Sequence, residues 1–308
     1  MRGYKIFAGS ASTQFAQEVC QILDVPLAKA DIKKFSDGEI SVQISESVRG
    51  RDVFIIQSTG SPSNDNLMEL LIMTDALRRS SASSITAVVP YYGYARQDRK
   101  AAPRVPITAR LVADMYETAG IDRVVTIDLH AGQIQGFFNI PVDNLYGSVT
   151  FENYIKSKNL KNPIIASPDI GGVARARYFA SRMGLDMVIV DKRRQKANES
   201  EVMNIIGDVE GKNVIMIDDM VDTAGTMVKA ATALKNKGAE SVMACATHAV
   251  LSGKAYENLD NGELDELIVT NTLESKQHKK IIVLTVAPLF AEVIRRVYHN
   301  ESVNSLFA

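Results

Sequence analysis

The stretch NVIMIDDMVDTAGTMVKAATALKNKGAESVMACATHA fills residues 213–249 and decides the fold class. It runs from a Val/Ile-rich segment through a polar loop and an amphipathic segment to a second apolar run. A strand buried on both faces is nearly continuously apolar, and a helix is the usual crossover between two parallel strands. The stretch therefore predicts one strand–helix–strand unit of a parallel sheet.

The same order occurs earlier in the chain, at residues 52–93, and short apolar runs alternate with helical patterns throughout. We expect an α/β protein with two doubly wound parallel sheets related by duplication. A length of 308 residues is also more typical of two domains than of one. The predicted domains are residues 1–145 and 146–292, and residues 293–308 are expected to return to the first.

Composition excludes several functions. Hydrophobic residues make up 46% of the chain, charged residues 23%, and the formal net charge is −1. This balance lacks the basic excess of a general nucleic-acid or membrane-surface protein, so we expect neither partner. The longest apolar run near the C-terminus is shorter than the roughly 20 residues of a membrane span. We expect a cytoplasmic protein whose two cysteines, Cys20 and Cys245, are buried and reduced.

The loop after the first run of 213–249 combines two opposite chemical features. Residues 222–226, Asp-Thr-Ala-Gly-Thr, lead into a helix, whose free N–H groups and dipole favour an anion. Asp218 and Asp219, just before them, would repel a phosphate but accept hydrogen bonds from sugar hydroxyls. A phosphorylated sugar satisfies both halves, whereas an acidic strand end beside an ordinary helix start is the alternative. The Gly-Lys-Ser/Thr ending of a Walker A loop is absent.

This loop resembles the phosphoribosyl-binding motif of type I phosphoribosyltransferases. Five further motifs occur in a fixed order: FSDGEISVQI (35–44), VPYYGYARQDRK (89–100), DLHAGQIQGFF (128–138), SPDIGGVARAR (167–177) and DKRR (191–194). Together they resemble the ribose-phosphate pyrophosphokinase family of the bacterial and mammalian class, over essentially the whole chain. The resemblance implies two phosphoribosyltransferase-like domains. In the second, Asp218, Asp219, Asp222, Thr223, Ala224, Gly225, Thr226 and Arg194 would bind ribose 5-phosphate.

The resemblance also implies an ATP site. Its residues would be Phe35, Asp37, Gly38, Glu39, Arg96, Gln97, Asp98 and Arg99, with residues 35–39 supplied by a neighbouring subunit. A purine-stacking aromatic, acceptors for an exocyclic amine and guanidinium groups for phosphates suit such a site. Without the resemblance, residues 35–39 predict only a turn. The basic cluster of Arg96, Arg99 and Lys100 would then predict a solvent-exposed charged surface.

Catalytic and metal residues follow from the same resemblance. Lys192, Arg194 and His130 would be catalytic, with the two cations closing over the triphosphate on a polar, flexible loop. His130 and Asp169 would serve Mg²⁺, and Asp169 is the stronger candidate because Mg²⁺ prefers oxygen ligands. On pattern alone, a lone histidine is usually structural and DKRRQKANESE is a surface loop.

The implied reaction converts ribose 5-phosphate and ATP into phosphoribosyl pyrophosphate and AMP. Asp219 is the candidate general base.

The resemblance further implies a homo-oligomer, a hexamer built from dimers, activated by inorganic phosphate and inhibited by ADP. Ser47, Arg49, Ser81, Arg104 and Ser302 match the effector region, and Asn304 departs from a serine common there.

Two other functions remain open on sequence grounds. A phosphoribosyltransferase would share residues 218–226, but it needs no ATP site, so the 35–39 and 96–100 segments argue against it. A non-catalytic regulatory homologue is expected to have a degraded sugar loop or catalytic loop, and both are intact here.

Overall fold

The structure is a computed structural model that describes residues 3–193 and 202–307. The chain divides into two compact units. The first unit comprises Met1–Tyr146 together with Val286–Ala308, and the second comprises Gly147–Thr285. The return to the first unit begins at Val286, earlier than the expected residue 293, because the whole C-terminal helix α8 (Ala287–His299) packs on that unit.

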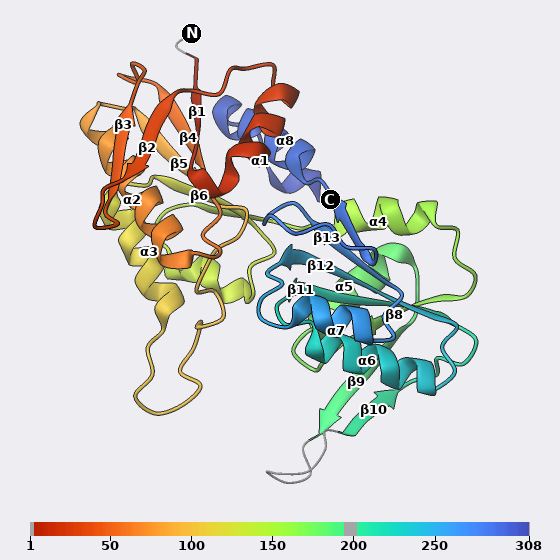
Figure 1. Cartoon of the computed structure of the whole chain (residues 1–308). Helices are drawn as coiled ribbons and strands as arrows, with labels where there is room; N and C mark the ends of the chain where they lie inside the picture. The colour runs from red at the N-terminus through yellow and green to blue at the C-terminus, as the bar shows by residue number, and fades with distance from the viewer. Residues whose placement is uncertain (1–2, 194–201, 308) are drawn as a thin grey trace. The chain divides into compact units, whose positions relative to one another are not determined.

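The first unit is built on a five-stranded parallel sheet in the order β1-β4-β5-β6-β7 (Figure 1). Its strands are β1 (Lys5–Ala8), β4 (Asp52–Ile56), β5 (Ser84–Val88), β6 (Arg123–Ile127) and β7 (Val142–Leu145). Its helices are α1 (Thr13–Ile22), α2 (Ser63–Arg79), α3 (Thr108–Ala119) and α8, with 3-10 turns η1 (Ser10–Ser12), η2 (Gly132–Phe137) and η3 (Asn304–Leu306). A separate antiparallel hairpin pairs β2 (Ala30–Lys34) with β3 (Ile40–Ile44).

Helices cover both faces of this sheet. Alternate side chains of a strand face opposite sides, so Phe7 and Ile55 pack with α2 and α3, whereas Ile6 and Phe54 pack with α1 and α8. The C-terminal helix contacts α1 through an edge-to-face ring pair, with 5.4 Å between the centroids of Phe15 and Phe290. The last helix of the chain therefore completes the core of the first unit.

The second unit has a seven-stranded sheet in the order β10-β9-β8-β11-β12-β13-β14, parallel except for β10. Its strands are β8 (Pro163–Ser167), β9 (Met187–Arg193), β10 (Val202–Ile206), β11 (Asn213–Val221), β12 (Ser241–Ala249), β13 (Glu266–Thr270) and β14 (Ile281–Leu284). Its helices are α4 (Ser148–Ser157), α5 (Val173–Met183), α6 (Gly225–Asn236) and α7 (Ala255–Asn261).

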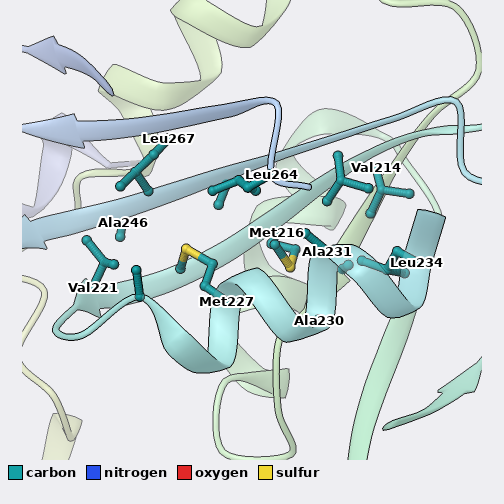
Figure 2. Packing of buried hydrophobic residues seen from close by; sticks show 14 of the residues in the cluster. Val214, Met216, Val221, Met227, Ala230, Ala231, Leu234, Ala246, Leu264 and Leu267 are labelled. Atoms are coloured by element: carbon teal, nitrogen blue, oxygen red, sulfur yellow. The ribbon is translucent and has the colours of Figure 1, made fainter. Parts of the chain in front are cut away.

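The predicted strand–helix–strand unit of residues 213–249 is β11-α6-β12. Figure 2 shows α6 lying along the sheet, with Met227 near Val221 of β11 at one end of the helix and Leu234 near Val214 at the other. The other sheet face packs against α4 and α5, for example through Ile215 on Phe179. Side chains of β11 are thus buried on both faces, which is why its sequence is continuously apolar up to Ile217.

The two units repeat one plan. The strand order β1-β4-β5-β6-β7 of the first matches β8-β11-β12-β13-β14 of the second, and in each a hairpin strand pair lies between the first two. This repeat agrees with the expected α/β architecture of two parallel sheets. The loops after β4 and β11 occupy equivalent places in the two units, at the carboxyl ends of strands, where open α/β sheets bind ligands.

Four strands were not expected from the sequence: β2, β3, β7 and β10. The β2–β3 hairpin is polar and half exposed, and β10 is an antiparallel edge strand, so none of these shows a buried apolar run. The sequence predicted a loop beginning at Lys192, and this start is wrong, because Lys192 belongs to β9 and pairs with Met203 of β10. Within the described ranges, no helix is long and apolar enough to cross a lipid bilayer.

Candidate active site

The acidic pair lies on β11 itself, and strand pairing explains its position. β8 pairs with β11 only as far as Met216, whereas β12 pairs with it to Val221. β11 therefore extends past the end of β8 and carries Asp218 and Asp219 beyond the last β8 residue. Asp219 is 3% exposed and Asp218 is partly exposed. The strand thus does not end at the acidic pair, as the sequence pattern predicted, but runs two residues further.

Arg175 contacts both carboxylates of the acidic pair. Its Nη1 lies 3.1 Å from Asp219 Oδ1 and 3.3 Å from Asp218 Oδ1. Arg175 stands in the first turn of α5, three residues after Gly172. Arg175 lies in the SPDIGGVARAR motif, just after a predicted strand and turn, and this position was the feature of the sequence that could have pointed to it. The guanidinium supplies the counter-charge that two adjacent carboxylates at a strand end need.

The pKa of the Asp218 carboxyl lies above the ordinary value of an aspartate. Burial raises the pKa of Asp218, and the negative charge of Asp219 raises it further, while Arg175 and the Asp219 N–H lower it. The two carboxyls titrate together, so the raised pKa belongs to the pair. A ligand that donates hydrogen bonds, or a cation, would favour the ionised pair.

The loop after the pair has the geometry of an anion site. α6 begins at Gly225, so the N–H groups at its start point out of the helix toward the loop. Thr223 and Thr226 are exposed, whereas Ala224 is buried and has the left-handed φ of 59°. The Asp222 carboxylate accepts a hydrogen bond from the Ser252 hydroxyl, so part of its function is to hold the loop against the next crossover. Residues 218–226 thus run from the last part of β11 into the first turn of α6.

The SPDIGG turn adjoins this site. Asp169 Oδ1 accepts a hydrogen bond of 2.8 Å from the Gly172 N–H. A Cβ at Gly172 would lie 3.0 Å from Ser167 Oγ and 3.8 Å from the Ile217 carbonyl oxygen, so this turn passes beside β11 just before Asp218. Asp169 is consequently near the acidic pair within the second unit.

The predicted adenine-binding segment is the tip of the β2–β3 hairpin. The Phe35 N–H donates to the Glu39 carbonyl, and Gly38 has the positive φ of 96° that the turn requires. The Asp37 carboxylate accepts from the Glu39 N–H at 3.1 Å. Phe35 is 60% exposed at this tip. The turn expected from the pattern is confirmed, and its aromatic ring is directed outward.

The predicted ATP-binding arginines, Arg96 and Arg99, follow a tightly packed residue, Gly93. Thr59, in the loop after β4, accepts a 2.7 Å hydrogen bond from the Gly93 N–H through its hydroxyl. A Cβ on Gly93 would lie 2.3 Å from the Thr59 carbonyl oxygen, so only glycine fits there. Further on, Gln97 accepts a hydrogen bond from the Ala109 N–H at the start of α3.

The charged side chains of this segment are exposed. Arg96, Gln97 and Arg99 all have exposed side chains, and Asp98 accepts a 2.8 Å hydrogen bond from Gln133. The two attachment points, at residues 93 and 97, hold the backbone on either side of Arg96.

The loop after β4 is held to α2 and to the turn after β1 by buried hydrogen bonds. The buried Glu69 carboxylate accepts hydrogen bonds from the Ser10 N–H (2.6 Å) and from Gln57 Nε2 (2.9 Å). Gln57 in turn fills the space beside Gly9, where a Cβ would lie 2.4 Å from it. The Glu69 carboxylate thus links α2 to the segments that follow β1 and β4.

The remaining candidate catalytic residues are only partly placed. His130 is exposed and lies in the turn after β6, in the first unit, next to Asp128, whose φ is 44°. The backbone of Lys192 belongs to β9, but its side chain lies outside what the structure describes. Arg194 also lies outside the described residues.

Two of the five predicted effector residues are in contact. Arg49 Nη1 donates a 3.1 Å hydrogen bond to Ser81 Oγ, and the Gly50 N–H donates to the Ser81 carbonyl at 2.7 Å. Ser47 and Arg104 are exposed in the same unit, and the Ser302 carbonyl accepts from Arg296. Asn304 begins the 3-10 turn η3. The five residues share a unit, and one pair among them is joined.

Magnesium fits the carboxylates of this chain. Mg²⁺ is usually held by one or two carboxylates together with substrate phosphates and water. Among residues 3–193 and 202–307, no group of three or more potential metal ligands of the His, Cys, Asp or Glu type gathers. Asp169 at its glycine turn is a hard oxygen ligand of the kind that Mg²⁺ prefers.

Comparison with known proteins gives the family. Residues 4–120 match the model of the N-terminal domain of ribose phosphate pyrophosphokinase, and residues 193–308 match that of the phosphoribosyl synthetase-associated domain. The ribose-phosphate pyrophosphokinase of Campylobacter jejuni is 73% identical over 308 residues, with both chains covered completely. The chain belongs to the ribose-phosphate pyrophosphokinase family. The Vibrio cholerae enzyme of the same name is 54% identical over 313 residues, again with complete coverage of both.

A solved structure supports the same assignment. The crystal structure of phosphoribosylpyrophosphate synthetase from Mycobacterium smegmatis matches with a TM-score of 0.92 and 44% identity, covering 97% of this chain and 99% of that one. The resemblance that the motifs carried and the expected fold class are therefore confirmed.

Proposed function

We propose that this enzyme transfers the β,γ-pyrophosphoryl group of Mg-ATP to the 1-hydroxyl of ribose 5-phosphate, giving 5-phosphoribosyl 1-pyrophosphate and AMP. The observation that supports this most strongly is the continuous site of residues 218–226, where an acidic pair adjoins a helix-start anion loop. Full-length relatives named ribose-phosphate pyrophosphokinase support the activity independently. The product serves as a precursor for nucleotide, histidine and tryptophan biosynthesis.

Ribose 5-phosphate binds with its two ends on different groups. The N–H groups at the start of α6 and the hydroxyls of Thr223 and Thr226 take the 5-phosphate. Asp218 and Asp219 accept hydrogen bonds from the 2- and 3-hydroxyls, and Arg175 fixes their orientation. Orienting the sugar in this way presents its 1-hydroxyl to ATP, and positioning of that kind supplies a large part of the rate in phosphoryl transfer.

ATP is held by the first unit. Arg96, Arg99, Gln97 and Asp98 bind the triphosphate and purine, because guanidinium groups match phosphate oxygens and stack on bases. Phe35, Asp37, Gly38 and Glu39 complete the adenine site of a neighbouring subunit. The outward exposure of Phe35 at a hairpin tip supports this division, since an exposed aromatic ring without a neighbouring surface is unfavourable.

In the chemical step, the ribose 1-oxygen forms a bond to the β-phosphorus, and the bond from that phosphorus to the α–β bridging oxygen breaks. AMP leaves with the bridging oxygen, and the hydroxyl proton passes to a carboxylate of the acidic pair, with Asp219 as the candidate base. Lys192, Arg194 and His130 stabilise the charge that develops on the pyrophosphoryl group. Asp169 and His130 would hold Mg²⁺, which supplies charge neutralisation at the phosphates when bound.

We infer a cytoplasmic homo-oligomer, a hexamer of three dimers, regulated at an effector site. The Arg49–Ser81 pair offers a guanidinium and a hydroxyl, which suit inorganic phosphate, and Ser47, Arg104 and Ser302 would complete that site. Phosphate would activate there and ADP would inhibit.

One assay separates this function from the alternatives. Purified enzyme with Mg²⁺, ATP and ribose 5-phosphate, and without any nucleobase, should form AMP. A phosphoribosyltransferase would instead release pyrophosphate only when a base is present. Lys192→Ala should abolish AMP formation with the fold retained. If neither the wild-type enzyme nor Lys192→Ala formed AMP, the protein would be a non-catalytic homologue.

A further inference from the structure

The peptide between Thr223 and Ala224 has a fixed direction inside the proposed sugar-phosphate loop. Ala224 has φ 59° and ψ −4°, a left-handed conformation that is unfavourable for residues with a Cβ. Such a conformation persists when neighbouring contacts enforce it. Two contacts do so here. The Ala224 methyl is buried in the core beside α6, and the Thr223 carbonyl accepts a 2.8 Å hydrogen bond from Asn258 Nδ2.

A planar trans peptide turns its C=O and its N–H in opposite directions. The Asn258 amide holds the carbonyl of Thr223, and so it also determines where the N–H of Ala224 points, away from Asn258. Within the described part of the chain, that N–H donates to no other protein group. It is therefore an available donor in the loop that starts α6.

Asn258 is itself rigidly placed. It lies on α7 next to Leu259, which is fully buried in the same core as α6. At the end of α7, a Cβ on Gly262 would lie 2.2 Å from Val228 Cγ1, so the two helices are packed as closely as glycine allows. The crossover before α7 adds a second attachment, because the Leu251 N–H donates to the Val221 carbonyl at 3.0 Å.

From this geometry we propose that Asn258 is a positioning residue for ribose 5-phosphate, acting through the Thr223 carbonyl to aim the Ala224 N–H at the 5-phosphate. The proposed action of Asn258 is on this peptide and not on the substrate itself. If the peptide turned over, a carbonyl oxygen would face the phosphate and repel it. The proposal rests on the proposed function of residues 222–226 as the phosphate loop.

The test is Asn258→Asp, which has the same shape but replaces the amide donor by a carboxylate that repels the Thr223 carbonyl. The expected result is a rise of about tenfold or more in the KM for ribose 5-phosphate, with the KM for ATP unchanged. Asn261→Asp is the matched control, because it introduces the same charge at an exposed position one turn further along α7. Asn258→Gln keeps the amide donor and should recover part of the affinity.

Thr226→Val tests the phosphate-loop assignment separately from the positioning role of Asn258, because it removes a hydroxyl from the proposed loop itself. Equal KM values for ribose 5-phosphate in the Asn258→Asp and Asn261→Asp enzymes, together with a raised value in Thr226→Val, would overturn the positioning role alone. An unchanged value in Thr226→Val would overturn the phosphate-loop assignment and the role of Asn258 with it. Isothermal titration with ribose 5-phosphate checks that the KM changes are changes in binding.

Discussion

The guanidinium of Arg175 lies 3.1 Å from the carboxylate of Asp219, and the same Nη1 lies 3.3 Å from Asp218. One cation from the first turn of α5 thus bridges two neighbouring carboxylates on β11. This arrangement keeps two acids side by side at a position where burial opposes their ionisation.

Replacing Arg175 by Met should weaken the sugar site. Loss of the cation removes an interaction that lowers the pKa of Asp218, so that pKa rises further above its ordinary value. Because the ionised pair is proposed to accept hydrogen bonds from the ribose hydroxyls, the acid limb of kcat/KM for ribose 5-phosphate should move to higher pH. At neutral pH we expect a loss of about 10- to 100-fold, the usual effect of losing charged hydrogen bonds.

Rate profiles between about pH 6 and pH 9 check this prediction. Arg177→Met, at an exposed position of the same helix, is the matched control and should keep the wild-type profile. An Arg175→Met enzyme with an unmoved acid limb would show that the guanidinium does not control the charge of the pair.

Substituting Ala for Gly225 should affect binding without affecting folding. A Cβ there would lie 3.6 Å from Thr223 Oγ1 and 3.7 Å from Asn258 Nδ2, which are ordinary contacts. The added methyl would nevertheless occupy the start of α6, which is the proposed binding place of the 5-phosphate. We expect a KM for ribose 5-phosphate raised about tenfold and a Tm within about 2 °C of wild type.

Gly136→Ala is the control, since no atom lies within 4 Å of a Cβ at that position. Steady-state kinetics and thermal melts on both variants decide the point. If Gly225→Ala bound ribose 5-phosphate as well as Gly136→Ala does, the phosphate would not lie against the start of α6.

Gly93→Ala should disturb the ATP half of the site instead. The new Cβ would lie 2.3 Å from the backbone oxygen of Thr59, so the segment leading to Arg96 must shift. Overpacking of this kind costs about 1–3 kcal/mol of folding stability. We expect a raised KM for ATP with a nearly unchanged KM for ribose 5-phosphate.

A pair of substitutions at Thr59 tests the same contact from the other side. Thr59→Ser keeps the hydroxyl that accepts from the Gly93 N–H and should retain the KM for ATP, whereas Thr59→Val loses it and should not. Equal ATP kinetics in the two would contradict a positioning role for this contact.

The C-terminal helix should stabilise the first unit. Phe290 of α8 is fully buried against Phe15, so Phe290→Ala is expected to cost about 3–5 kcal/mol of unfolding free energy. Leu111→Ala, on an exposed part of α3, should cost far less. Urea unfolding followed by circular dichroism measures both, and equal costs would mean that α8 is not part of this core.

Much of the fold followed from local pattern, because strands such as β11 and β12 are buried on both faces and are apolar almost throughout. The β2–β3 hairpin and β10 could not be found in this way, since edge and half-exposed strands carry no such run. The return of α8 to the first unit depends on packing between segments far apart in sequence, so its start at Val286 was misplaced.

The site divides similarly. Residues 218–226 are contiguous, and their spacing alone indicated a sugar and a phosphate. Arg175 contacts Asp219, and Asn258 contacts the Thr223 carbonyl, although both residues are far from 218–226 in the sequence. Only the fold reveals these contacts.

The transfer of label from ATP tests the central claim most directly. Incubation of the enzyme with ribose 5-phosphate, Mg²⁺ and ATP labelled at the β-phosphorus should move the label into phosphoribosyl pyrophosphate, with one AMP formed for each product molecule. Label that remains in ADP, or that leaves ATP only as free pyrophosphate, would contradict attack of the ribose 1-hydroxyl on the β-phosphorus.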